Sequence, residues 1–186
     1  EDTAVPPENL ADFIMEFRAL LDSHGLAYGM FGHVDAGVLH VRPALDMCDP
    51  EQEKQLRVIS DQVVKLTAKY GGLMWGEHGK GYRSEYGPEF FGEALFTELR
   101  KIKTAFDPFN RVNPGKICTP VDSSEQLVSV DGVKRGFYDR QIPVVVKQSF
   151  DSSLNCNGNG LCFNYEENSP MCPSSKVTKD RRHSPK

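Results

Sequence analysis

The sequence predicts an α+β layer sandwich with an irregular tail, and two observations support this prediction. The hydrophobic period is helical, then alternating, then helical again over residues 1–118, whereas beyond them the pattern dissolves into Ser, Asp, Gly and Pro. With 186 residues, of which 39% are hydrophobic, the chain can bury one ordinary core. We therefore expect one domain over 1–118, a linker over 119–155 with one short strand at 142–147, and a cysteine-containing tail over 156–186.

Three helices are predicted, because apolar residues recur there at three- and four-residue steps. They cover residues 7–25, 49–70 and 88–106. The second has a capping carboxylate in Asp49 and a proline, Pro50, at its first helical position. In the third, the residues expected to point inward are Phe91, Leu95, Leu99 and Ile102.

A β-hairpin is predicted between the first two helices. Residues 26–33 and 38–43 alternate between apolar and polar or small side chains, and a glycine-containing turn separates them. A turn centred after Ala36 places His33 opposite His40, with their Cβ atoms about 5 Å apart. The sequence thus predicts two neighbouring imidazoles on one face of the hairpin.

Two imidazoles at that separation can ligate one metal ion if a carboxylate completes the set. Glu77, within the glycine-spaced stretch 75–81, is the candidate carboxylate. The same spacing also fits a pair of ordinary half-buried histidines, and the glycine-spaced stretch also fits a flexible surface connection. Spacing alone leaves both interpretations open.

Three motifs in order make the pattern more specific. They are Gly32-His33 to Leu39-His40, Gly76-Glu77-His78-Gly79, and Phe106-Asp107-Pro108 followed by Asn113-Pro114-Gly115-Lys116. Together they resemble the C-terminal domain of the FAD-linked oxidase family, which includes D-lactate dehydrogenase, the glycolate oxidase flavoprotein subunit and D-2-hydroxyglutarate dehydrogenase. The resemblance covers about residues 8–118 and implies a ferredoxin-like antiparallel sheet covered by helices. It also implies a domain truncated on its N-terminal side, without most of the FAD-binding surface.

The resemblance implies roles for individual residues. The expected ligands of a divalent ion, usually zinc in this family, are His33, His40 and Glu77. His78 lies by the flavin and substrate in the family, and we expect it to act as the catalytic base. The remaining candidates are charged or amide side chains: Arg42, Lys80 and Arg83 for a substrate carboxylate, and Asn113 and Lys116 for the flavin. Arg42 also fits an ordinary exposed ion pair.

Three cysteines lie close together near the end of the chain, at Cys156, Cys162 and Cys172. Their spacing is looser than that of a ferredoxin, and the residues alone leave iron-sulfur, zinc and no metal as alternatives. A resemblance to large bacterial fusions with an iron-sulfur module implies a [4Fe-4S] cluster, which would pass electrons from FAD to a downstream acceptor. Cys48 and Cys118 are expected to be ordinary thiols.

The expected function is FAD-dependent oxidation of a D-2-hydroxy acid, either 2-hydroxyglutarate or a lactate- or glycolate-like acid, to the 2-oxo acid. The chain begins with Glu1 rather than Met, and we expect an inactive piece of a larger enzyme. The alternative is a non-catalytic, metal-stabilised α+β binding module. A net charge of −4 argues against nucleic-acid binding, and the apolar runs are too short to predict a transmembrane segment. Five cysteines, an odd number unevenly placed, favour a reducing cytoplasm over a disulfide framework. Homo-oligomer formation stays open.

Overall fold

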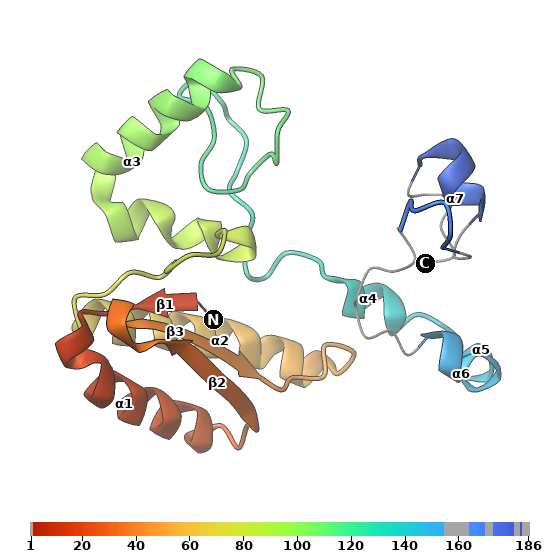
Figure 1. The fold of residues 1–186 in the computed structure, drawn as a ribbon, viewed down its shortest axis with the longest axis horizontal. Helices are drawn as coiled ribbons and strands as arrows, with labels where there is room; N and C mark the ends of the chain where they lie inside the picture. Colours follow the sequence, from red (N-terminus) through yellow and green to blue (C-terminus); the bar gives the residue numbers. More distant parts are fainter. Residues whose placement is uncertain (1, 155–163, 170–172, 181–182, 184–186) are drawn as a thin grey trace. The chain divides into compact units, whose positions relative to one another are not determined.

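The computed structural model describes residues 2–154, 164–169, 173–180 and 183. The chain divides into two compact units, Glu1–Gln141 and Ile142–Lys186. The first unit carries the sheet and the long helices (Figure 1). The three tail cysteines, Cys156, Cys162 and Cys172, lie outside the described residues.

A three-stranded antiparallel sheet forms the centre of the first unit. Its strand order is β1 (Asp2–Ala4), β3 (Val38–Pro43), β2 (Tyr28–His33). Helices α1 (Leu10–Ser23) and α2 (Pro50–Lys69) lie beside it, as Figure 1 shows. This arrangement confirms the predicted α+β fold.

The core lies between the two helices and one face of the sheet. Strand β3 contributes Leu39 and Val41 to this face. The helices contribute large apolar side chains at three- and four-residue steps: Phe13, Phe17 and Leu21 from α1, and Ile59, Val63 and Leu66 from α2. Because side chains alternate along a strand, the residue between Leu39 and Val41, which is His40, belongs to the opposite face. The core and the predicted histidine site therefore occupy different faces of one sheet.

The predicted register of the hairpin is wrong by two residues. The strands are joined by a short 3₁₀ turn, η2 (Val34–Ala36), and by Gly37 in the left-handed conformation at φ 67°. This connection places Phe31, rather than His33, opposite His40. A shift of two residues keeps every side chain on its face, so His33 and His40 remain diagonal neighbours on the same face.

Helix α2 begins as its sequence predicts. The Asp49 carboxylate accepts a hydrogen bond of 2.9 Å from the backbone N–H of Glu51, and Pro50 occupies the first turn. Helix α1 is preceded by the short 3₁₀ turn η1 (Pro7–Asn9), so the predicted first helix divides into two elements.

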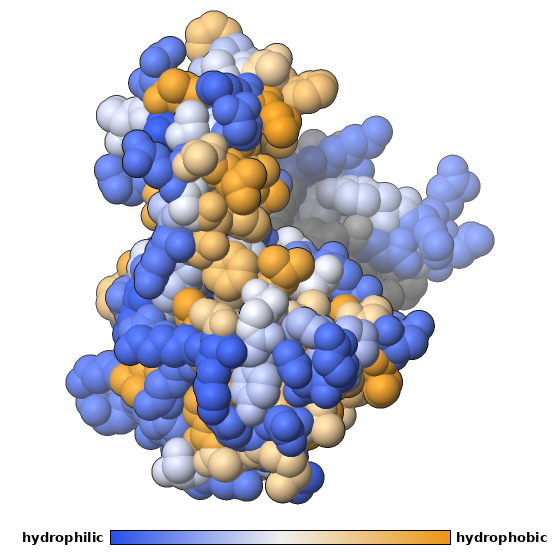
Figure 2. Space-filling view, turned by 90° about the vertical axis from the view of Figure 1, so that its left-hand side faces the viewer, coloured by the Kyte–Doolittle hydropathy of each residue, from blue (hydrophilic) through white to orange (hydrophobic). Residues whose placement is uncertain are grey.

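Helix α3 (Gly87–Phe106) has the predicted bounds, but Gly92 interrupts it with φ 70° and ψ 165°. The expectation that its apolar stripe points inward is wrong for Leu95 and Ile102, which are 62% and 56% exposed. Phe91 and Leu99 are partly buried, and Phe91 stacks on Trp75. Figure 2 shows hydrophobic side chains at the surface of this upper part of the unit. Periodicity identifies an apolar face but carries no information about what covers it.

Within the first unit, residues 119–141 are held to α2 and η3 through polar contacts. The Arg57 guanidinium on α2 contacts Glu85 at 2.8 Å in the 3₁₀ segment η3 (Gly81–Tyr86) and Asp131 at 2.7 Å. A short helix, α4 (Arg135–Asp139), follows. These ion pairs join three segments that are distant in the sequence.

The second unit contains short helices among its described residues. The predicted strand at 142–147 is wrong, because this stretch contains the start of helix α5 (Val144–Ser149). Pro143 immediately precedes that helix, and its backbone φ of −55° suits a helix start. The further helices are α6 (Asp151–Leu154) and α7 (Pro173–Thr178).

The hairpin turn provides a test of the fold. A Cβ at Gly37 would lie 1.8 Å from the carbonyl oxygen of Val5, and the backbone φ there is +67°. We expect Gly37→Ala to lower the free energy of unfolding by about 3 kcal/mol, because it adds steric overlap to left-handed strain. Gly25→Ala is the matched control, since Gly25 has the same φ but no atom within 4 Å of the added Cβ. Urea unfolding measures both, and equal losses would contradict the described packing of the turn.

Candidate functional site

Two histidines and one glutamate converge on the sheet face opposite the core. The Nε2 atoms of His33 and His40 lie 3.1 Å and 2.8 Å from the same Oε1 atom of Glu77. The hairpin supplies both imidazoles, and the loop between α2 and η3 supplies the carboxylate. The three ligand atoms all lie within 4.8 Å of one another, so the structure brings the predicted metal ligands together.

This donor set fits a divalent cation. Zinc binds imidazole nitrogen and carboxylate oxygen at about 2.0–2.2 Å, so the ligand atoms of a tetrahedral site lie roughly 3.4 Å apart. The observed separations of 2.8 Å and 3.1 Å are hydrogen-bond distances slightly below that value, so a small outward shift of these side chains would accommodate the ion. The set is also asymmetric, because the side chain of His40 is 3% exposed whereas those of His33 and Glu77 are 57% and 45% exposed. One side of the site is therefore fixed by packing, and the other is open to solvent.

His78 lies beside the three ligands but is oriented differently. Its ring stacks on His40 with centroids 4.6 Å apart and an interplanar angle of 6°. The ring nitrogens of His40 and His78, with the carboxylate of Asp2, form a second group that could in principle hold a metal. Parallel stacked rings direct their nitrogen lone pairs along parallel planes, so both cannot point at one ion. His78 is therefore a neighbour of the ligand group, with Nε2 at 3.9 Å from Oε1 of Glu77 and a side chain that is about half exposed.

Asp2 is the residue of this site that the sequence analysis missed. Its carboxylate, which is 2% exposed, accepts hydrogen bonds from the backbone N–H groups of Glu77 at 3.1 Å and His78 at 2.7 Å. Its other oxygen lies 3.3 Å from Nδ1 of His40. No local signal identifies Asp2, because β1 is a three-residue strand that also contains Thr3 and the partners of Asp2 lie far along the sequence.

The three predicted carboxylate-binding cations differ in their surroundings. The ammonium of Lys80 lies 3.4 Å from the ring centroid of Trp75 and 4.5 Å from that of Phe91. Burial, together with the positive charge of Arg83, lowers the pKa of Lys80 to about 8. Arg42 follows His40 by two residues on β3, so it shares the face of the histidine site. Arg83 donates a hydrogen bond of 3.0 Å to the backbone carbonyl of Met74.

The predicted flavin contacts, Asn113 and Lys116, lie in an exposed turn after α3. The Asn113 carbonyl accepts a 3.1 Å hydrogen bond from the N–H of Lys116, and Asn113 has a positive φ of 46°. The residue after Lys116, Ile117, donates its backbone N–H to the Ser84 hydroxyl of η3 at 2.9 Å. The structure gathers the predicted metal ligands with His78, and among the described residues Asn113 and Lys116 make no hydrogen bond or ion pair with that group.

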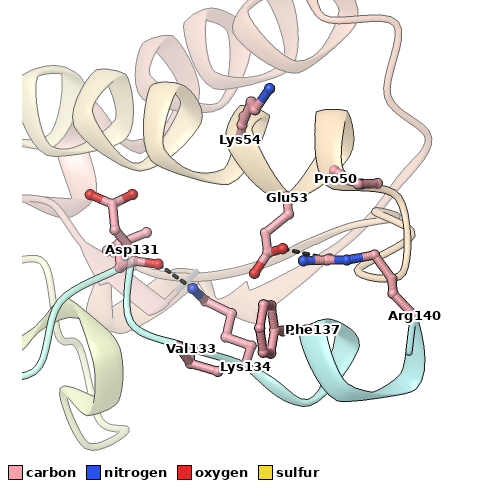
Figure 3. Close-up of a pocket in the computed structure, with 9 residues that line it drawn as sticks. Pro50, Glu53, Lys54, Asp131, Val133, Lys134, Phe137 and Arg140 are labelled. Carbon is pink, nitrogen blue, oxygen red and sulfur yellow. Dashed lines mark hydrogen bonds and ion pairs between the residues drawn. The ribbon is translucent and has the colours of Figure 1, made fainter. Parts of the chain in front are cut away.

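A separate cavity lies between α2 and α4, as Figure 3 shows. The charged groups around it already have partners within the protein. Arg140 contacts Glu53 at 2.6 Å, and the ammonium of Lys134 contacts the carbonyls of Val130 and Gly132. This cavity is consistent with a structural junction that fastens the segment after residue 118 to α2.

Cys48 and Cys118 are free thiols, as the sequence predicts. Burial raises the pKa of the Cys118 thiol. No helix among the described residues has both the length and the apolar character needed to cross a bilayer.

Comparison with known proteins agrees with this geometry. Residues 1–117 match the model of the family described as FAD linked oxidases, C-terminal domain. The chain is 71% identical to a D-2-hydroxyglutarate dehydrogenase of Pantoea ananatis and 70% identical to one of Escherichia coli K12, in each case over all of this chain and 18% of the relative. A D-lactate dehydrogenase of Anaerostipes hadrus is 34% identical over 63% of this chain and 25% of its own length.

The chain thus spans about a fifth of the length of the first curated relatives that it matches. The family model nevertheless matches more than half of this chain. The matched residues include His33, His40, Glu77 and His78. The chain belongs to the family of FAD linked oxidases, and its residues 1–117 form the domain that is C-terminal in that family.

Proposed function

We propose that this chain supplies the metal ligands and the catalytic base of a FAD-dependent dehydrogenase that oxidises D-2-hydroxyglutarate to the 2-oxo acid. The observation that carries the proposal is the convergence of His33, His40 and Glu77 beside His78. Two relatives at 71% and 70% identity, both named D-2-hydroxyglutarate dehydrogenase, support the choice of substrate. Family membership favours a part of an enzyme over a non-catalytic binding module.

His33, His40 and Glu77 would hold the ion, for which zinc suits a set of two imidazoles and one carboxylate. When bound, the ion supplies a Lewis acid for the hydroxyl and carboxylate oxygens of a 2-hydroxy acid. His40 is buried, so packing holds this ligand in place. His33 and Glu77 are about half exposed, so a substrate can reach the ion from their side.

His78 would remove the proton from the substrate hydroxyl. Its imidazole is stacked on a buried ring, which fixes its plane, and it is about half exposed, which leaves its edge available. General-base catalysis needs a group held within hydrogen-bond reach of the proton that it removes. FAD, when bound, supplies the acceptor for the hydride that leaves the same carbon.

The substrate carries two carboxylates, and the chain offers cations for them. Arg42 shares a sheet face with His40, and Lys80 follows His78 by two residues. A guanidinium can bind a carboxylate through two parallel hydrogen bonds, whereas an ammonium acts as a point charge. We assign Arg42 and Lys80 to the carboxylates, and Arg83 to a supporting role because it already binds the Met74 carbonyl.

The further cofactor contacts stay predictions. Asn113 and Lys116 are proposed to contact FAD once the remainder of the protein is present, on the strength of the family motif. Cys156, Cys162 and Cys172 are proposed as ligands of a [4Fe-4S] cluster that leads electrons to a downstream acceptor, again from the resemblance. We also propose a cytoplasmic location for the protein.

The role of His78 can be tested in the complete protein that contains this chain. We expect His78→Asn to slow reduction of bound FAD by D-2-hydroxyglutarate about 10²- to 10⁴-fold, because the hydroxyl proton loses its acceptor. Stopped-flow absorbance of the flavin measures the rate. His24→Asn is the control, since His24 is a partly exposed histidine outside the site that pairs with Gln62. Unchanged reduction in His78→Asn would exclude the proposed base.

The proposed role of Lys80 predicts a pH dependence. Below its pKa of about 8 the ammonium is charged and can hold a carboxylate, and above it the charge is lost. We therefore expect the KM for D-2-hydroxyglutarate to rise as the pH increases through about 8. Lys80→Arg should flatten that rise, because a guanidinium stays charged throughout this range. If the two proteins show the same profile from pH 7 to about 9.5, Lys80 does not bind the substrate.

A further inference from the structure

Asp2 is a buried carboxylate whose surroundings require explanation. Burying an ionised group is costly unless it is paired and hydrogen-bonded. One of its oxygens, Oδ2, is satisfied by the backbone N–H groups of Glu77 at 3.1 Å and His78 at 2.7 Å. Strand β1 places Asp2 directly beside His40, because these two residues are paired in the sheet.

The second oxygen of Asp2 faces the ring of His40. Oδ1 lies 3.3 Å from Nδ1 of His40, and each side chain is only 3% exposed. This is an ion-pair distance rather than an aligned hydrogen bond, and Nδ1 has no hydrogen-bond partner among the described residues. The nearby polar group that faces Nδ1 is thus a carboxylate, which as an ion only accepts hydrogen bonds.

His40 lies between two carboxylates, because Asp2 faces Nδ1 at 3.3 Å and Glu77 lies 2.8 Å from Nε2. When Glu77 ligates an ion, Asp2 is the remaining acceptor at the ring and draws the proton of the neutral imidazole to Nδ1. If Nδ1 is the donor, the lone pair is on Nε2. Nε2 of His40 is the atom that lies 2.8 Å from Glu77 in the proposed ligand group. The ring is also held between Phe31, with centroids 5.0 Å apart, and His78, with centroids 4.6 Å apart, so packing opposes reorientation of the ring.

We propose that Asp2 is a positioning residue that fixes the Nδ1–H tautomer of His40 and thereby directs the lone pair of Nε2 toward the ion. The inference deepens the metal site proposed above and rests on it for its functional consequence. The same carboxylate anchors the backbone of Glu77 and His78, so one side chain orients a ligand ring and the loop that carries the other ligand and the base. Such outer partners of metal-bound histidines set the tautomer and typically contribute 10- to 100-fold in metal affinity.

Asp2→Asn is the most informative variant, because the amide has the shape of the carboxylate but replaces the acceptor that faces Nδ1 of His40 with a donor. The amide oxygen can still accept from the backbone N–H groups of Glu77 and His78, while the amide nitrogen then donates toward Nδ1 of His40. This donor favours the opposite tautomer, in which Nε2 carries the proton and cannot bind a metal. Asp35→Asn is the matched control, because Asp35 is an exposed carboxylate in the same hairpin connection.

The tautomer test uses the 186-residue chain without metal and with Glu77→Ala, which removes the competing acceptor at Nε2. The histidines are labelled with ¹⁵N, and spectra are recorded at about pH 9 where ordinary histidines are neutral. Long-range ¹H–¹⁵N correlation spectra report which nitrogen of His40 carries the proton. In this Glu77→Ala background we expect Nδ1–H when Asp2 is unchanged and in Asp35→Asn, and Nε2–H in Asp2→Asn. The zinc measurement uses chains that keep Glu77. Zinc affinity, measured by competition with a chromophoric chelator, should fall 10- to 100-fold in Asp2→Asn alone.

Either of two results would overturn the inference: an Nε2–H tautomer in Glu77→Ala, or the same tautomer and the same zinc affinity when Asp2→Asn is introduced. The spectrum of Glu77→Ala decides the matter even if Asp2→Asn does not fold. If His40 carries its proton on Nδ1 and the chain binds no zinc, the proposed metal site fails while the positioning of His40 by Asp2 stands.

Discussion

The alternation of side chains along β3 is the constraint on which the site and the core both depend. Leu39 and Val41 point into the core between the sheet and the two helices, which fixes the strand in depth and rotation. Once they are fixed, His40 must emerge on the other face. A one-residue slip of β3 would place an imidazole in the core and an apolar side chain in the site. The register that packs the core is therefore also the register that assembles the site.

The site consists of a rigid half and an open half. Asp2 and His40 are buried on adjacent strands, whereas His33, Glu77 and His78 are about half exposed. A site held in this way needs little reorganisation when a ligand arrives, because its buried partners already determine orientation. The exposed members can admit a substrate to the ion and to the base from one side.

Much of the fold and the ligand group could be predicted from the sequence, because local patterns encode them. The helix that starts at Pro50 could be predicted from the capping Asp49 and the proline, and the two strands of the hairpin from their alternating side chains. The register of the hairpin could not be predicted, since it depends on the backbone conformation of residues 34–37. The role of Asp2 and the exposure of α3 also escaped prediction, because both depend on contacts between distant segments rather than on local pattern.

The central claim is that two imidazoles and one carboxylate of this chain hold a metal ion, and X-ray absorption at the zinc edge tests it most directly. The zinc-loaded chain should show only nitrogen and oxygen neighbours at about 2.0–2.2 Å, including two imidazoles. His33→Ala should remove one imidazole from that shell. Sulfur neighbours at about 2.3 Å would instead place the metal on cysteines and contradict the claim, as would a chain that retains no zinc.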